Sequence, residues 1–558
     1  MSSKKLAWLV SSLFLFTLCS AAQEAEKFSA RTELVVLPVL VSTKAGHHVT
    51  GLRKEDFTLT ENGVEQKIAF FEEVRTTKER LHRAAPQENT FSNFLSGQPT
   101  PKRVTIIVLD LLNTEFIDQV YARKGLLDFL GNSVDATEPI AVFLLTRSGL
   151  KVVHDFTTDP QVLVEAVKRI KGAHDQVAVP VADQTRMSDA KTMLFDSAVA
   201  SDASALQSMT DAAKQAEISR NSQQQRLAIV YTLEAMQQLA RAFGGLPGRK
   251  SVIWATGGFP FDVSDTTMQL AAPGQMSLQD VLPIYERTWQ LLNDANIAIY
   301  AVDAKGLVGP SIGSAGLQSS RMNNPFAMAQ DSWARLNSID ALRVFANETG
   351  GKAFFNSNDI AGGFQKAAED SAQYYVLAYY LDHTKKKPGW HKLGVTVKGD
   401  LTVRARSGFL LTKTTADWKS TQVTDMDMAV RSPIDYTEIP MRLRWTKIGP
   451  GKNGGSRSVE YYVDLPAGTA TVDEQDDNHV RLEFVAAIRK PDGKDLQEPD
   501  LKVMDAHVKK ENIATLSASG ITYRNVIEVP PGEYNVRFVV RDGITGKMGS
   551  VGATLKVN

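Results

Sequence analysis

The sequence predicts a mixed α/β protein in which a central, mainly parallel, doubly wound (Rossmann-like) sheet is flanked by all-β sandwich units. Three observations predict this. Short apolar segments alternate with segments of helical periodicity over residues 101–371, the pattern of a parallel sheet with helices on its faces. Segments of strand periodicity lie on either side of this region, at 31–75 and 372–412. A second run of alternating segments fills residues 435–558.

Length and charge bound the protein class. The chain has 558 residues, too many for one compact core, so several domains are expected. Lys and Arg number 63 and so do Asp and Glu, which gives no net field that would favour nucleic acid. The single cysteine, Cys19, excludes a disulfide framework and a site built from several thiolates.

Residues 1–22 have the layout of a secretory signal peptide. Two lysines precede an apolar run, Leu6–Leu18, which is short for a membrane span, and small residues follow it. We therefore expect cleavage after Ala22 and an exported protein; an uncleaved anchor helix is the alternative. The pattern leaves a periplasmic, an outer-membrane-associated and a secreted protein all open. No later apolar stretch reaches about 20 residues, so no transmembrane span is expected after signal removal.

The N-terminal β unit, residues 31–75, begins with a strand that is apolar in both alternating phases, so we expect burial on both of its faces. Asn62-Gly63 between two alternating segments predicts a hairpin. A unit of this size is thin for independent stability, and the strands over 372–412 have the same problem. We therefore expect the two segments to form one sandwich, with two separate small sheets as the alternative. Residues 76–100 are polar and predict a linker.

Within 101–371 the apolar strands and amphipathic helices define the α/β domain. Two stretches do not fit its core: 174–226, which predicts a mostly helical insertion, and 305–330, which predicts a mobile loop. The predicted strands are Val104–Asp110, Ile140–Leu145, Ser251–Ala255, Ile297–Asp303 and a short one from Ala353. The alternating segments of 435–558 predict a C-terminal immunoglobulin-like β-sandwich.

The most suggestive chemical feature is Asp110, at the carboxyl end of the first parallel strand, with Asn113 and Thr114 just beyond it. Ligands bind at this edge in open α/β sheets. The Asp and the hydroxyl could hold a hard divalent cation through oxygen. The alternative, which spacing alone favours, is that Asn113 or Thr114 caps the following helix, with Asp110 complementing its dipole.

These residues also carry a resemblance. Asp110-x-x-x-Thr114, followed by Ile253-Trp-Ala-Thr-Gly-Gly258 and Ile299–Asp303, resembles a von Willebrand factor type A (VWA) domain. The closer similarity, over about residues 30–412, is to the VWA-related proteins abundant in Acidobacteria. It rests on the order of six further motifs: Gly51–Phe57, Glu61–Gly63, Pro247–Lys250, Thr349–Gly351, Tyr374–Leu377 and Arg404–Phe409.

The resemblance implies a metal-ion-dependent adhesion site, whose pattern is Asp-x-Ser-x-Ser, a distant Thr and an Asp in a Thr-Asp-Gly turn. Here Leu112 replaces the middle Ser and Gly257 stands where the turn Asp is expected. Losing these oxygen ligands argues for a degenerate site and for no cofactor. If Mg²⁺ or Ca²⁺ binds, the ligands implied are Asp110, Thr114 and a distant Thr, for which Thr192 is the best candidate and Thr185 another. Asp262 or Asp265 could replace the missing acid.

The sequence holds no nucleophile with an adjacent base and no metalloprotease, phosphate-loop or dinucleotide motif, so no enzyme activity is expected. We expect an exported, non-enzymatic binding protein that recognises a protein partner, not nucleic acid, through carboxyl-edge loops. The expected binding residues are Asp110, Asn113, Thr114, Thr256, Gly257 and Gly258. Two alternatives stay open: a metal-dependent adhesion module, and an envelope scaffold that uses its β-sandwich domains.

Overall fold

The computed structural model describes about two thirds of the chain. The described residues are 32–75, 89–93, 103–134, 138–170, 224, 226–258, 278–306, 339–382, 386–387, 389–411 and 421–558 without 453 and 475. The expected signal peptide (1–22), nearly all of the expected insertion (174–226) and the expected loop beyond Gly306 lie outside them. Within these residues the fold is mixed α/β, with four antiparallel sheets and one mixed sheet that contains parallel strands.

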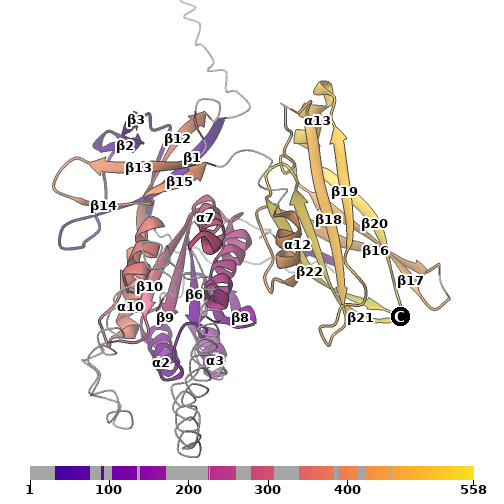
Figure 1. Ribbon diagram of the computed structural model, residues 1–558, viewed down its shortest axis with the longest axis horizontal. Helices are drawn as coiled ribbons and strands as arrows, with labels where there is room; N and C mark the ends of the chain where they lie inside the picture. Colours follow the sequence, from indigo (N-terminus) through magenta and orange to yellow (C-terminus); the bar gives the residue numbers. More distant parts are fainter. Residues whose placement is uncertain are drawn as a thin grey trace, which may run out of the picture.

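The mixed sheet forms the centre of the α/β unit, residues 103–370 (Figure 1). Its strand order is β11-β10-β9-β6-β7-β8, and all neighbours are parallel except β7 and β8, which are antiparallel. The strands are β6 (Arg103–Asp110), β7 (Ile140–Thr146), β8 (Gly149–Thr157), β9 (Arg249–Thr256), β10 (Ile297–Asp303) and β11 (Lys352–Phe354).

Helices cover both faces of this sheet because its central strands are apolar in both alternating phases. Ile107 and Leu109 of β6 pack with the helices α2 (Phe116–Asn132), α3 (Pro160–Lys168) and α10 (Ile360–Asp370). Ile106 and Val108 face the other way. They join a core with α7 (Leu278–Asp294) and with helices over 226–243 and 339–348.

The first sandwich combines strands from both sides of the α/β unit. β1 pairs with β12 and β2 pairs with β13, both antiparallel, so residues 32–75 and 373–411 share one core. The sheet orders are β14-β1-β12-β4 and β15-β13-β2-β3. The strands are β1 (Thr32–Ser42), β2 (Phe57–Glu61, after the short helix η1, Lys54–Asp56), β3 (Val64–Gln66), β4 (Phe70–Arg75), β12 (Gln373–Asp382), β13 (Gly389–Val397), β14 (Thr402–Arg404) and β15 (Gly408–Leu411).

The C-terminal sandwich has two four-stranded sheets, β20-β17-β16-β5 and β19-β18-β21-β22, around a second apolar core. Helix α12 (Gln422–Arg431) precedes it and α13 (Lys510–Ser519) joins β19 to β20. The strands are β16 (Arg442–Pro450), β17 (Arg457–Leu465), β18 (His479–Arg489), β19 (Asp500–His507), β20 (Ile521–Val529), β21 (Gly532–Asp542) and β22 (Met548–Val557).

Its remaining strand, β5 (Thr90–Ser92), corrects the predicted linker over 76–100. β5 pairs with β16, with Phe91 opposite Leu443. The next residue, Asn93, is buried: its Nδ2 donates to the carbonyl oxygens of Tyr436 (2.6 Å) and Ile439 (2.8 Å). The part of the chain that was expected to be a linker therefore contributes an edge strand to a sandwich whose other strands begin some 350 residues later.

Both sandwiches are packed against the α/β unit. The first lies on the amino edge of the parallel strands, where the backbone N–H of Arg249 donates to Tyr374 Oη (3.1 Å). The C-terminal sandwich packs against the helical face formed by 226–243 and α7, and its Tyr436 and Val539 belong to the same apolar core. Among the described residues no helix has both the length and the apolar composition needed to span a membrane.

Candidate functional site

The candidate site lies at the carboxyl edge, where β6, β9 and β10 end. Along the chain β6 is followed by β7 on one side, whereas β9 lies on its other side, so the direction of winding reverses between β6 and β9. Such a reversal is where open α/β sheets bind their ligands. Asp110 ends β6 at this point, and extending the pairing of the two strands brings it beside Thr256, the last residue of β9.

Asp110 is 2% exposed, and five donors surround its carboxylate. Oδ1 accepts from the backbone N–H groups of Leu112 (3.0 Å) and Asn113 (2.9 Å). Oδ2 accepts from Asn113 Nδ2 (2.8 Å), Trp254 Nε1 (3.1 Å) and Thr256 Oγ1 (2.8 Å). A carboxylate offers about four lone-pair sites, so protein donors already occupy its capacity.

The electrostatics of Asp110 follow from this enclosure. Burial raises the pKa of Asp110, and the hydrogen bonds from Asn113, Thr256 and Trp254 oppose that rise. Because all five surrounding groups can donate, the ionised carboxylate is the form that they satisfy.

Thr114 ties the start of α2 to the turn after β9. Its Oγ1 accepts from the N–H of Gly257 (2.8 Å), and its carbonyl accepts from Gln119 Nε2 (2.9 Å). A side chain at Gly257 has no room: a Cβ there would lie 2.9 Å from the carbonyl oxygen of Asn113, with Lys305 Cε at 3.3 Å. The packing around position 257 therefore leaves no room for the Asp that the adhesion-site pattern has there.

These contacts test whether a hard cation fits. The residues that the resemblance implies, Asp110 and Thr114, use their oxygens on protein donors, and Leu112 is buried apolar. Among the described residues no three His, Cys, Asp or Glu side chains are placed to hold a metal ion. The described residues as arranged do not fit Mg²⁺ or Ca²⁺. The other candidates, Thr185, Thr192, Asp262 and Asp265, lie outside the described part of the chain.

The structure thus brings together the six expected residues Asp110, Asn113, Thr114, Thr256, Gly257 and Gly258, and adds two that the sequence analysis missed. Trp254 is fully buried with its indole N–H on Asp110, and Thr232 Oγ1 accepts from Asn113 Nδ2 (2.9 Å). Strand periodicity could have found Trp254, because it shares a face with Thr256 two residues later. We call Asp110, Asn113, Thr114, Trp254 and Thr256 the Asp110 cluster.

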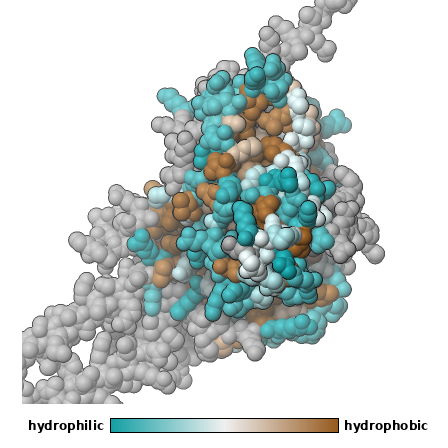
Figure 2. All heavy atoms as spheres, turned by 90° about the vertical axis from the view of Figure 1, so that its right-hand side faces the viewer, coloured by the Kyte–Doolittle hydropathy of each residue, from teal (hydrophilic) through white to brown (hydrophobic). Residues whose placement is uncertain are grey.

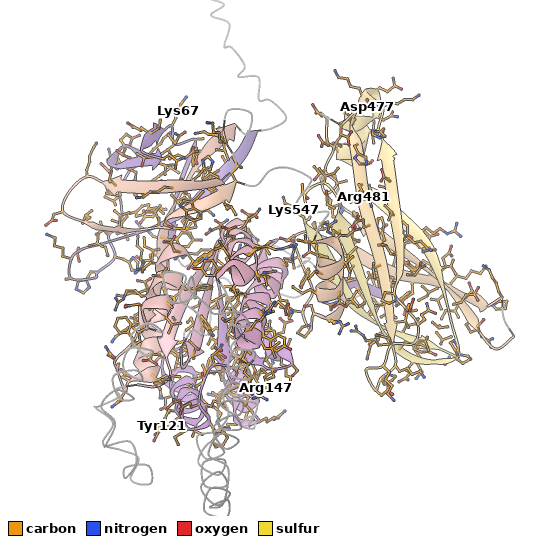
Figure 3. The ribbon with its side chains drawn as sticks, in the orientation of Figure 1. Lys67, Tyr121, Arg147, Asp477, Arg481 and Lys547 are labelled. Carbon is orange, nitrogen blue, oxygen red and sulfur yellow. The ribbon has the colours of Figure 1, made fainter. Side chains whose placement is uncertain are left out.

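Directly beyond this cluster, the first two turns of α2 expose apolar side chains. The helical spacing of Phe116 and Val120 is typical of a buried face, but the structure buries Ala122, Leu126 and Phe129 instead. Figure 3 shows Tyr121 at the end of the α/β unit away from the first sandwich. The exposed residues are Phe116 (40%), Ile117 (56%), Val120 (39%) and Tyr121 (55%).

Several motifs that carry the resemblance lie at the opposite, amino edge. Arg249 Nη2 donates to the carbonyl oxygen of Gly350 (2.8 Å) and to Tyr300 Oη (3.3 Å). A Cβ on Gly351 would lie 1.8 Å from the carbonyl oxygen of Ile299, so only glycine fits this approach. Arg404 pairs with Asp370, and Arg406 reaches across to α7. These motifs hold the first sandwich on the α/β unit and do not form part of the carboxyl-edge site.

Comparison with known proteins assigns no family: no protein-family model matches this chain, and no curated protein is significantly similar to it.

Proposed function

We propose that this chain is an exported, non-enzymatic binding protein with a VWA-type central domain, which recognises a protein partner at the carboxyl edge without a metal ion. The observation that carries the proposal is the apolar surface of α2, defined by Phe116, Ile117, Val120 and Tyr121. Contiguous exposed apolar side chains on a folded protein mark interaction sites.

The surface gathers four exposed apolar side chains within the first two turns of α2, whereas the polar Gln119 of the same turns is buried. By contrast, the face shown in Figure 2 mixes small apolar groups with polar ones. In the C-terminal sandwich the exposed apolar side chains of β19, Leu501 and Val503, alternate with charged neighbours. Scattered apolar side chains of this kind are ordinary on a protein surface.

The Asp110 cluster makes the α2 surface rigid. The link from Gly257 N–H to Thr114 Oγ1 fixes the start of the helix, and the Asp110 carboxylate fixes the turn before it. A surface that is already ordered loses little conformational entropy on binding. Fully burying an aromatic or branched side chain contributes about 1.5–3 kcal/mol, so four half-exposed ones supply roughly 4 kcal/mol. Neighbouring contacts must add to this for micromolar affinity, which needs about 8 kcal/mol.

Two further observations support the VWA-type assignment and the export. The order Asp110-x-x-x-Thr114 lies at the point where the sheet reverses its winding, with helices on both faces. The pattern of residues 1–22 supports export. Metal-free recognition is supported by the five donors that saturate Asp110.

The test is affinity capture from envelope and secreted fractions of the source cells, with EDTA present, using the full mature chain as bait. We expect Ile117→Asp/Tyr121→Asp to abolish capture of a partner that the unchanged chain retains. Val423→Asp is the control, because Val423 is exposed on α12, which lies beside the C-terminal sandwich, whereas α2 lies at the end of the α/β unit away from the first sandwich (Figure 1). Equal capture by the double variant would refute the proposal. Capture that needs Mg²⁺ or Ca²⁺ would favour a metal-dependent adhesion module.

A further inference from the structure

A small polar pocket lies at the seam between the first sandwich and the amino edge of the α/β unit, far from the proposed binding surface. Its walls come from β1, β9, the end of α7, the turn before β10 and the segment between β14 and β15. The lining residues are Pro38, Arg249, Asn293, Asn296, Ile297, Thr349 and Arg406.

Three of these residues bring buried polar atoms that the described protein does not satisfy. Asn293 and Arg249 are each 2% exposed. Both ends of the Asn293 amide, Arg249 Nε and Asn296 Oδ1 have no hydrogen-bond partner among the described residues. A buried polar group without a partner costs about 1–3 kcal/mol, and native proteins satisfy such groups with protein or ordered water.

The pocket is held open by other contacts of the same residues. Arg249 is fixed through Nη2, which donates to the carbonyl oxygen of Gly350 (2.8 Å). Arg406 Nη1 donates to the carbonyl oxygen of Asn293 (2.6 Å), and its Nη2 donates to that of Val36 (3.0 Å).

We propose that this pocket binds one ordered water molecule as a permanent part of the seam. The cavity volume is about 10 Å³, close to the roughly 10–15 Å³ that the centre of one water molecule requires. The water accepts from Arg249 Nε, donates to Asn296 Oδ1 and makes a third hydrogen bond with the Asn293 amide. Three bonds are typical of an internal water.

The mixture of donors and acceptors selects water over a small anion. An anion accepts from Arg249 Nε but cannot donate, so it leaves the amide oxygen of Asn296 unsatisfied. A cation could bind the amide oxygen of Asn296, but it cannot accept a hydrogen bond from Arg249 Nε and would be repelled by the guanidinium charge. Because the three residues belong to β9, α7 and the turn before β10, the water links elements whose other contacts support the first sandwich.

Two measurements on the full mature chain test this. A high-resolution crystal structure should show one density peak within hydrogen-bond distance of Arg249 Nε, Asn293 and Asn296 Oδ1, and no anomalous peak there after a bromide soak. Deuteron magnetic relaxation dispersion should count one long-lived water fewer in Asn293→Leu. The count should not change in Asn132→Leu, which alters an exposed Asn at the end of α2.

An empty pocket, a bromide peak or an unchanged water count would overturn the proposal. If Asn293→Leu does not fold, Asn296→Gly serves instead. Asn296 has a φ of 51°, which glycine adopts readily, so this change removes the amide oxygen without straining the backbone. The crystal result on the unchanged chain stands independently of either variant.

Discussion

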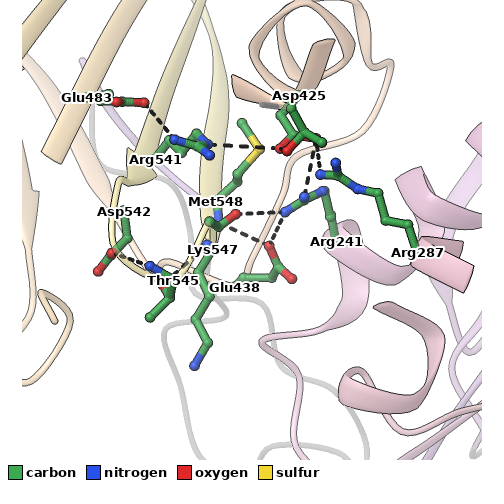
Figure 4. A network of polar contacts seen from close by, with 12 residues as sticks. Arg241, Arg287, Asp425, Glu438, Glu483, Arg541, Asp542, Thr545, Lys547 and Met548 are labelled. Atoms are coloured by element: carbon green, nitrogen blue, oxygen red, sulfur yellow. Dashed lines mark hydrogen bonds and ion pairs between the residues drawn. The ribbon is translucent and has the colours of Figure 1, made fainter. Parts of the chain in front are cut away.

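Replacing Asp425 by Asn should uncouple the C-terminal sandwich from the α/β unit. Asp425 lies on α12, is 2% exposed and sits among three guanidinium groups (Figure 4). Its Oδ1 pairs with Arg287 and lies 3.4 Å from Arg241 Nη2, and its Oδ2 lies 3.9 Å from Arg541 Nε. The cluster joins helices of the α/β unit to strands of the sandwich.

The magnitude follows from the charge balance of this cluster. Two more carboxylates belong to it: Glu438 Oε2 lies 2.9 Å from Arg241 Nη1, and Glu483 Oε2 lies 3.0 Å from Arg541 Nη1. Glu483 also pairs with Arg481 (2.9 Å), which in turn pairs with Asp505 (2.5 Å), so four guanidinium groups face four carboxylates. Asp425→Asn therefore leaves one buried positive charge without compensation. Breaking a buried ion pair by removing one partner typically costs about 3–5 kcal/mol. Since Asn has almost the same shape as Asp, little of that loss arises from packing.

The assay is thermal unfolding of the full mature chain, with Asp427→Asn as the matched control. Asp427 is on the same helix but pairs with Arg431 at 2.8 Å on the surface, where the two side chains are 56% and 74% exposed. An exposed pair of this kind contributes about 0.3–0.5 kcal/mol. At roughly 2–4 °C per kcal/mol, Asp425→Asn should lower the midpoint of the sandwich transition by about 6–20 °C, and the control by less than about 2 °C. Equal shifts would refute the idea that Asp425 organises this junction.

Three further predictions concern Asp110, Lys250 and Gly245. Asp110→Ala removes the carboxylate that accepts hydrogen bonds from the indole N–H of Trp254 and the side-chain amide of Asn113. The free energy of unfolding, measured in urea, should therefore fall by about 3 kcal/mol. A loss under about 1 kcal/mol would mean that water replaces the carboxylate. Burial lowers the pKa of Lys250 to about 7 from its ordinary 10.5, so folding stability should rise with pH between these values. Lys250→Met should therefore stabilise the protein by at most about 5 kcal/mol at pH 7, because the pKa shift of about 3.5 units corresponds to 1.36 kcal/mol per unit. At pH 9.5 the gain should be much smaller. A gain that does not depend on pH would show that Lys250 is solvated. Gly245→Ala places a Cβ 1.9 Å from the carbonyl oxygen of Thr437 and should destabilise the junction by about 2 kcal/mol or more in the same urea assay. No change in stability would mean that the backbone at Thr437 moves to make room for the methyl group.

Periodicity accounts for most elements of the fold, because burial on one or both faces dictates the apolar pattern of a strand. The N-terminal β unit is too small to be stable alone, which led us to expect that it pairs with strands beyond the α/β unit. In the structure β1 is hydrogen-bonded to β12. Strand β5 was not predicted, because three residues in a polar segment are too few to show a strand periodicity. Its position is set by its partner β16 and by the buried Asn93.

The candidate site was predictable only in part. The carboxyl-edge rule located Asp110 and Thr256, which the structure places in contact. Spacing could not decide between a cation ligand and a turn-stabilising carboxylate, since both uses need the same residue at the same position. It also could not tell which face of α2 is buried, because Phe116 and Val120 are as apolar as Ala122 and Leu126.

Recognition of a protein partner through the α2 surface, without a metal ion, is the central proposal. Site-specific photo-crosslinking tests it most directly: Tyr121 is replaced by p-benzoylphenylalanine in cells that make the protein, and Val423, which is 81% exposed, is replaced in a parallel strain. We expect a discrete crosslinked protein adduct from position 121 that persists with EDTA, and none from position 423. No adduct at 121, the same adducts at both positions, or an adduct that disappears with EDTA would contradict the proposal.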